Sequence, residues 1–74
     1  RGTMLKPLRW RTGPVPVDAN GIGMEVYFEL RDGRGHGLGT GEKKGGVWEG
    51  DWHLRKESIL RWLPLSEILA LVED

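Results

Sequence analysis

The feature that most constrains the fold is a stretch of alternating residues followed by a row of alternating glycines. In residues 24–30, MEVYFEL, apolar and polar side chains alternate strictly, which predicts a half-buried β-strand. Asp32-Gly33 follows and favours a two-residue turn with positive φ at both positions. We therefore predict a hairpin whose second strand has one face of bare backbone, the glycine row, formed by Gly35, Gly37, Gly39 and Gly41.

A two-residue turn also determines the register of this hairpin. It places Phe28 opposite Gly37, and directly opposed residues share a face of the sheet. The glycine row therefore lies beside the apolar side chains of the first strand. Because glycine in a strand often marks close approach by another group, we expect the flat rings of Trp48 and Trp62 to cover the row. A partner's backbone or aromatic group could use the same row.

The rest of the chain predicts a small β-domain with a helix at its end. Residues 47–54, VWEGDWHL, indicate a third strand, and residues 59–63 indicate a short fourth one. Pro64 blocks further sheet pairing, and apolar residues then recur at helical spacing, at Leu65, Ile68, Leu69 and Val72. The expected fold class is mainly β (small α+β), with a three- to four-stranded antiparallel sheet or small barrel and a short C-terminal helix.

The chain has 74 residues and four tryptophans, so its core depends on a few large rings. We expect one small domain over residues 4–74 and interpret residues 1–3 as a vector remnant. A core of this size rarely supplies more than ~3–5 kcal/mol, and each tryptophan can bury about 150–250 Å². We therefore expect three of the four tryptophans in the core, out of Trp10, Trp48, Trp52 and Trp62.

Composition also limits the compartment and the partners. The chain has no cysteine, which fits a reducing cytoplasm. It has no apolar run near the ~20 residues that a membrane span needs, so we expect no membrane partner. Eleven basic residues balance eleven acidic ones, and this balance disfavours a general nucleic-acid-binding protein. Every charge before Asp18 is nevertheless positive, so the molecule is expected to be electrically bipolar, which would orient docking.

Few residues suit catalysis or the binding of a cofactor. The chain holds two serines and two histidines, and catalysis needs a nucleophile, acid or base in a shaped pocket. The glycine-rich residues 33–46 match neither the dinucleotide fingerprint nor the P-loop. Asp51 and His53, with His36, lack a recognised metal-ligand spacing. The sequence therefore predicts a non-enzymatic protein with no catalytic residue, no cofactor and no metal site.

Several landmarks resemble a family of short phage and prophage proteins of unknown function. Those chains have a tryptophan before a proline-containing loop, two strands around a D-G or similar turn, a lone tryptophan, and a tail similar to hydrophobic-x-x-W-x-P-L-P. The matching residues are Trp10, Pro14 or Pro16, strand 24–30, Asp32-Gly33, Trp48, and ILRWLPL at 59–65. The family tail is usually proline-rich, whereas residues 66–74 are predicted to be helical. The resemblance implies a phage origin and a host cytoplasm, and it implies no catalytic residues.

In size and make-up the chain also resembles small phage proteins that bind host RNA polymerase. We expect a monomer, and the resemblance implies that it docks on a host macromolecular machine, with the RNA polymerase of the transcription apparatus as the first candidate. It would modulate or inhibit that machine by occupancy. Basic side chains and one aromatic anchor are the predicted partner contacts, namely Arg9, Arg11, Arg31, Arg34, Lys43, Lys44 and Trp52.

Two other functions are open on the sequence. A small barrel-like nucleic-acid-binding module would use Arg9, Trp10 and Arg11 together with the loop lysines, because aromatic rings stack on bases and cations hold phosphates. An oligomeric structural protein would join its copies through residues 69–72, where apolar side chains continue beyond the expected core.

Overall fold

The computed structural model describes residues 8–73, without the side chains of residues 72 and 73. The expected domain start at residue 4, the remnant at 1–3 and the side chain of Val72 lie outside this description. Two single 3-10 turns, η1 (Arg31–Gly33) and η2 (Lys56–Ser58), precede β2 and β5. The main elements are β1 (Glu25–Leu30), β2 (His36–Gly41), β3 (Val47–Glu49), β4 (Trp52–Leu54), β5 (Ile59–Pro64) and the helix α1 (Leu65–Glu73).

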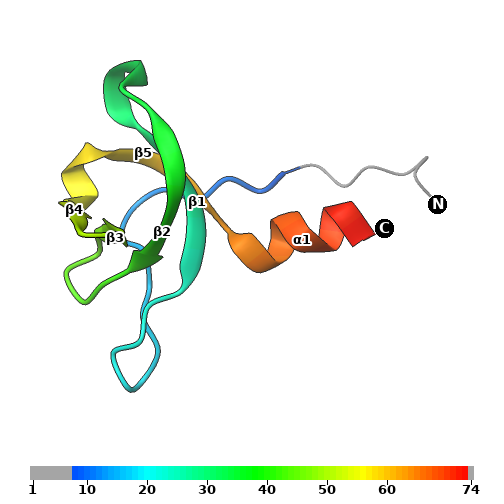
Figure 1. The fold of residues 1–74 in the computed structure, drawn as a ribbon, viewed down its shortest axis with the longest axis horizontal. Coiled ribbons are helices and arrows are strands. Elements are labelled where there is room, and N and C mark those ends of the chain that lie inside the picture. The colour runs from blue at the N-terminus through cyan, green and yellow to red at the C-terminus, as the bar shows by residue number, and fades with distance from the viewer. Residues whose placement is uncertain (1–7, 74) are drawn as a thin grey trace.

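The strands form one open antiparallel sheet in the order β4-β3-β2-β1-β5 (Figure 1). The mainly β class with a short C-terminal helix is confirmed, but the sheet has five strands and does not close into a barrel. The extra strand arises within residues 47–54. Gly50 adopts a φ of 61° and turns the chain back, so that Glu49 pairs with Trp52. The predicted third strand is thus a hairpin of β3 and β4.

The β1–β2 hairpin has the predicted turn and register. Asp32 and Gly33 have φ values of 64° and 65°, as a type I′ turn requires. Phe28 pairs with Gly37, and Val26 pairs with Gly39. The alternating pattern of the sequence therefore determines which side chains of these two strands share the core face.

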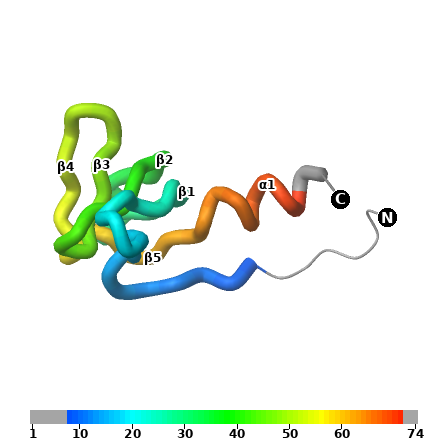
Figure 2. The backbone as a smooth tube through the Cα atoms, turned by 90° about the horizontal axis from the view of Figure 1, so that it is seen from below, coloured from blue at the N-terminus to red at the C-terminus, as the bar shows by residue number. Residues whose placement is uncertain are grey.

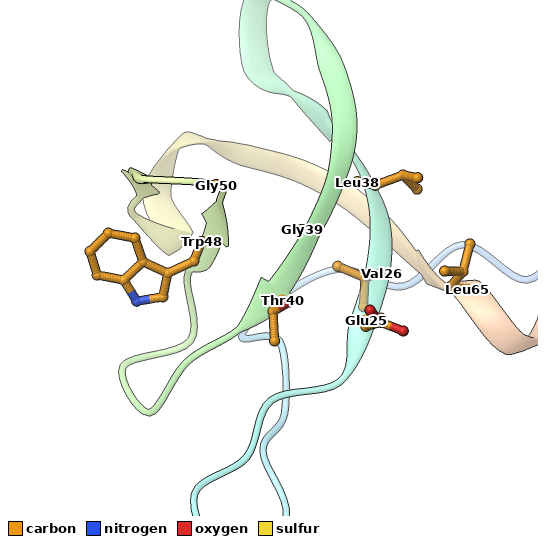
Figure 3. Close-up of a pocket in the computed structure, with 8 residues that line it drawn as sticks. All are labelled: Glu25, Val26, Leu38, Gly39, Thr40, Trp48, Gly50 and Leu65. Atoms are coloured by element: carbon orange, nitrogen blue, oxygen red, sulfur yellow. The ribbon is translucent and has the colours of Figure 1, made fainter.

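The glycine row is covered by different groups from those predicted. A Cβ atom on Gly39 would lie 2.8 Å from the carbonyl oxygen of Trp48 and 3.1 Å from the ring of Phe28. The Trp48 side chain is on the opposite face, because Trp48 pairs with Thr40 and paired residues share a face. Figure 3 shows its indole pointing away from Gly39. Trp62 pairs with Phe28, so Phe28 lies between Trp62 and the row. The prediction that indole rings cover the row is wrong.

The core contains one tryptophan instead of three. Trp62 is 5 % exposed, and its Nε1 donates a hydrogen bond to the carbonyl oxygen of Gly13 at 3.2 Å. Trp10 is half-buried, whereas Trp48 and Trp52 are 47 % and 76 % exposed. The short β3–β4 hairpin places these two rings at the margin of the sheet, beyond the main core. That core is formed by Val15, Val26, Phe28, Val47, Ile59 and Trp62.

The N-terminal arm, residues 8–17, covers one edge of the sheet. Arg11 and Trp62 exchange two backbone hydrogen bonds of 2.9 Å, so the arm protects β5. The arm and α1 extend from the same side of the sheet in both views (Figures 1 and 2). The nine-residue α1 packs against β1 and β5. No helix among residues 8–73 is long and apolar enough to cross a membrane.

Candidate binding surface

The predicted contact residues do not lie on one surface. Arg34 precedes β2 and Lys43 follows it, and six residues of strand span about 20 Å. Figure 1 shows the β1–β2 turn and the loop 42–46 at opposite ends of the sheet. Arg9 lies on the arm, on the side from which α1 extends. The seven residues therefore divide among several regions.

Two residues of the Arg-Trp-Arg triplet are engaged within the fold. Arg11 donates two hydrogen bonds to the carboxylate of Glu67, at 3.0 and 2.7 Å. The hydrogen bonds from Arg11 hold the pKa of Glu67 below its usual value of 4.5. The guanidinium of Arg61 lies 3.7 Å from the centroid of the Trp10 ring, a cation–π contact. The arm therefore uses Trp10 and Arg11 to attach itself to β5 and α1.

Lys44 and Trp52, in contrast, lie near further exposed aromatic and basic residues. Lys44 shares a hollow of about 440 Å³ with Arg55 and Lys56, and Trp52 is on the adjoining strand β4. Trp48 lies across the hairpin from His53, with ring centroids 4.9 Å apart. We call this region the aromatic edge and define it as Lys44, Trp48, Trp52, Arg55 and Lys56.

Two other predicted contact residues lie next to the aromatic edge without belonging to it. The Nε of Arg31 donates to the carbonyl oxygen of Glu57 at 2.9 Å, and Glu57 lines the same hollow as Lys44. The Lys43 side chain extends towards Gly21, whose added Cβ would lie 3.3 Å from the Lys43 Cε. Arg31 therefore contacts the turn η2, which carries Lys56, while Lys43 faces the loop at residues 18–22.

The two exposed indoles offer contact area on both faces of the hairpin. Trp48 pairs with His53, and Trp52 pairs with Glu49, so Trp48 and Trp52 lie on opposite faces. β4 is the last strand of the sheet, and within the described residues no strand pairs with its outer side. An incoming chain could therefore contact an indole and add to the open edge of the sheet at the same time.

Glu42 holds the lysine loop against β4. Its Oε1 accepts a hydrogen bond from the backbone N–H of Lys44, and its Oε2 pairs with Nε2 of His53. Its backbone also accepts from the N–H of Gly45 at 2.9 Å. The hydrogen bond from His53, followed by that from Lys44, lowers the pKa of Glu42 from its usual 4.5. One carboxylate thus sets the position of Lys44 beside the hairpin.

We expect the domain to lose stability in acid through Glu42 and Glu67. Both pKa values are lowered in the folded state, so the folded protein binds these protons less readily than the unfolded chain. The resulting stabilisation is present above pH 4.5 and is lost as the pH falls through the lowered values. Urea unfolding from neutral pH to about pH 3 should show this decline. Glu42→Gln should have a shallower decline, and a slope equal to that of the wild type would contradict the assignment.

The described residues do not bring together a group suited to hold a metal. Among residues 8–73, no three His, Cys, Asp or Glu side chains are placed to hold a metal ion.

Comparison of the chain with protein-family models, with curated proteins and with solved structures finds no match. The candidate site therefore depends on the geometry of the aromatic edge alone.

The sequence predicts two members of the aromatic edge, Lys44 and Trp52, as partner contacts. It places Trp48 over the glycine row instead, and it predicts no contact role for Arg55 or Lys56. The signal that could have found them is Gly50-Asp51, which is typical of a two-residue hairpin loop. A hairpin at this position makes the strands too short to reach far into the core and brings residues 55–56 back beside the loop 42–46.

Proposed function

We propose that this protein is a non-enzymatic binding module that acts by occupying a surface of another protein. The observation that supports this best is the 76 % exposure of Trp52, in a domain that has few large side chains with which to build a core. Tryptophan and arginine are enriched among the residues that dominate binding energy at protein interfaces. Trp52 is the proposed anchor on one face of the β3–β4 hairpin, and Trp48 contributes on the opposite face.

The charges around the aromatic edge favour a protein partner over a nucleic acid. Glu49 and Asp51 lie within three positions of Trp52, and Glu57 lines the hollow with Lys56. Carboxylates at these positions repel phosphate groups, whereas a mixed set of charges can pair with both signs on a protein surface. The balanced charge of the whole chain favours the same choice.

Bacterial RNA polymerase is the partner that we propose first. The basis is the resemblance of the chain in size and make-up to small phage proteins that bind this enzyme, together with its phage-type tail motif. The protein would then work in the host cytoplasm, where it would cover a polymerase surface or displace a factor.

A direct binding measurement tests this function. The full chain, labelled with a fluorophore, is titrated with purified bacterial RNA polymerase and followed by anisotropy. Trp52→Ala should weaken binding by about 30-fold, which corresponds to about 2 kcal/mol, the size of a hot-spot contribution. Ile22→Ala is the matched control, because Ile22 is also largely exposed, at 65 %, but lies in the loop 18–22. Equal binding by wild type and Trp52→Ala would contradict the proposal.

The same titration with single-stranded DNA and RNA distinguishes the nucleic-acid alternative. Lys44, Arg55 and Lys56 give that alternative its support, because cations beside exposed rings can bind phosphates and stack bases. Nucleic-acid binding should weaken steeply as salt is raised. We expect no such binding at physiological salt, and tight, salt-sensitive binding of DNA or RNA would favour the alternative over a protein partner.

A further inference from the structure

The two edges of the sheet differ in how the described residues protect them. At one edge the N-terminal arm covers β5, because Arg11 and Trp62 exchange two backbone hydrogen bonds. At the other edge β4 is the last strand, and both views show it at the margin of the molecule (Figures 1 and 2). Edge strands usually carry a proline, a lysine or a bulge that prevents further pairing. β4 has the sequence WHL, so its outer side is open to another strand.

The backbone of His53 supplies the donor and the acceptor on this open side. The two-residue loop 50–51 makes Glu49 and Trp52 the pair that closes the β3–β4 hairpin, and the two residues of a closing pair hydrogen-bond to each other. Hydrogen-bonded and non-hydrogen-bonded pairs alternate along an antiparallel ladder. His53 is the next residue along β4, so its N–H and C=O point away from β3.

The charges at the two ends of β4 complement each other. Asp51 precedes the strand, Arg55 follows it, and both are exposed. Among residues 8–73, neither side chain forms a hydrogen bond or an ion pair. If two copies of β4 pair antiparallel with His53 opposite His53, Asp51 of each copy lies opposite Arg55 of the other. Directly opposed residues share a face, so an ion pair forms on each side of the centre.

The other face of the same pairing is apolar. Trp52 is 76 % exposed, whereas Leu54 packs against the core. The register that joins His53 to its copy sets Trp52 of each chain opposite Leu54 of the other. These are non-hydrogen-bonded pairs, in which opposed side chains lie closest. Each indole therefore covers the leucine of the other copy, and the core of one chain continues into that of the next.

We propose that a second copy of this chain pairs with β4, in an antiparallel two-fold dimer whose axis passes between the two His53 residues. A two-fold contact uses the same patch on both subunits, and that patch must complement itself. The outer side of β4 does so in its backbone groups, its charges and its apolar side chains. Each His53 also pairs with Glu42 of its own chain, and this carboxylate offsets the charge of a protonated ring at the axis.

The contact is small, because each copy contributes a three-residue strand and one large ring. Small interfaces are weak, so we expect a dissociation constant between about 10 µM and 1 mM. The dimer covers Trp52 and would compete with the partner of the aromatic edge. That consequence rests on the proposed function, whereas the dimer itself does not.

Sedimentation equilibrium of the full chain, from dilute solution to about 1 mM, tests this dimer. The wild type should approach twice the 8.4 kDa of one chain as the concentration is raised. Arg55→Asp sets like charges opposite each other and should weaken dimerisation at least tenfold. The double variant Asp51→Arg/Arg55→Asp exchanges the two charges and should recover dimerisation to within about threefold of the wild type.

Arg34→Asp is the matched control. It makes the same change of net charge at an exposed residue beside the β1–β2 turn and should dimerise like the wild type. The substituted side chains are all exposed, so each variant should keep the fold, which circular dichroism verifies.

Three results would overturn the dimer. The first is a wild-type chain that stays at 8.4 kDa up to about 1 mM, where any association has a free energy weaker than about 4 kcal/mol. The second is an Arg55→Asp variant that dimerises as readily as the wild type. The third is a double variant that dimerises no better than Arg55→Asp.

The dimer and the proposed function can fail separately. The anisotropy titration with RNA polymerase uses a labelled chain too dilute to dimerise. A chain that binds the polymerase but stays monomeric at high concentration would remove the dimer alone. A chain that dimerises through β4 but does not bind the polymerase would remove the proposed partner alone.

Discussion

Trp62→Ala is expected to unfold the domain at room temperature. Trp62 is the only buried tryptophan among the described residues, and its backbone also pairs with Arg11. Replacing a buried tryptophan by alanine typically costs about 3–5 kcal/mol, and a core of this size rarely supplies more than ~3–5 kcal/mol. Circular dichroism during urea titration should show no cooperative transition for the variant.

Trp52→Ala provides the contrast that makes this result specific. Trp52 has the same side chain but is 76 % exposed, so its replacement should change the free energy of unfolding by no more than about 0.5 kcal/mol.

Trp62→Phe keeps a ring in the core and loses the hydrogen bond to Gly13, so this variant should remain folded with a lower urea midpoint than the wild type. A Trp62→Ala variant as stable as the wild type would show that the core is placed wrongly.

Gly39→Ala is expected to destabilise the domain by about 2–3 kcal/mol, towards the upper end of the cost of overpacking. The added methyl group would lie 2.8 Å from the carbonyl oxygen of Trp48 and 3.1 Å from the Phe28 ring. Neither group can move easily, because one belongs to the neighbouring strand β3 and the other fills the core. The measurement is the urea midpoint of the variant at neutral pH.

Gly37→Ala is the matched control for this prediction. Gly37 lies on the same strand and the same face, but the nearest atom to its added methyl group is the carboxylate of Glu49. That carboxylate is the end of a flexible, exposed side chain and can move aside. We expect a change of less than about 1 kcal/mol. Equal stability of Gly39→Ala and Gly37→Ala would contradict the claim that Gly39 is needed for β3 to approach β2 closely.

The β1–β2 hairpin could be predicted from the sequence because its signals are local. Strict alternation in residues 24–30 and the Asp32-Gly33 turn act within a few residues of each other, and together they determine the register. The position of each tryptophan depends instead on pairing between distant segments. Trp48 faces solvent because β3 pairs with β2 in the register that sets it opposite Thr40. Nothing near Trp48 in the sequence specifies that register.

The candidate site was harder to predict than the fold, for a related reason. Arg11 is of a residue type that is common at binding interfaces. Its partner Glu67, however, is 56 positions away in the sequence, and the pair is found only when α1 is placed beside the arm. Lys44 and Arg55 are eleven positions apart and share a hollow only because the β3–β4 hairpin brings the chain back. A basic residue in a sequence therefore indicates a surface charge, and the tertiary structure decides whether that charge remains available to a partner.

The most direct test of the central claim is a hydroxyl-radical footprint of the tryptophans, measured by mass spectrometry with and without bacterial RNA polymerase. In the free protein Trp52 should be oxidised fastest and Trp62 slowest, in line with their 76 % and 5 % exposure. In the complex we expect oxidation of Trp52 and Trp48 to fall, while that of Trp62 stays low. Oxidation of Trp52 at the same rate in the complex as in the free protein would contradict the claim that the aromatic edge is the binding surface.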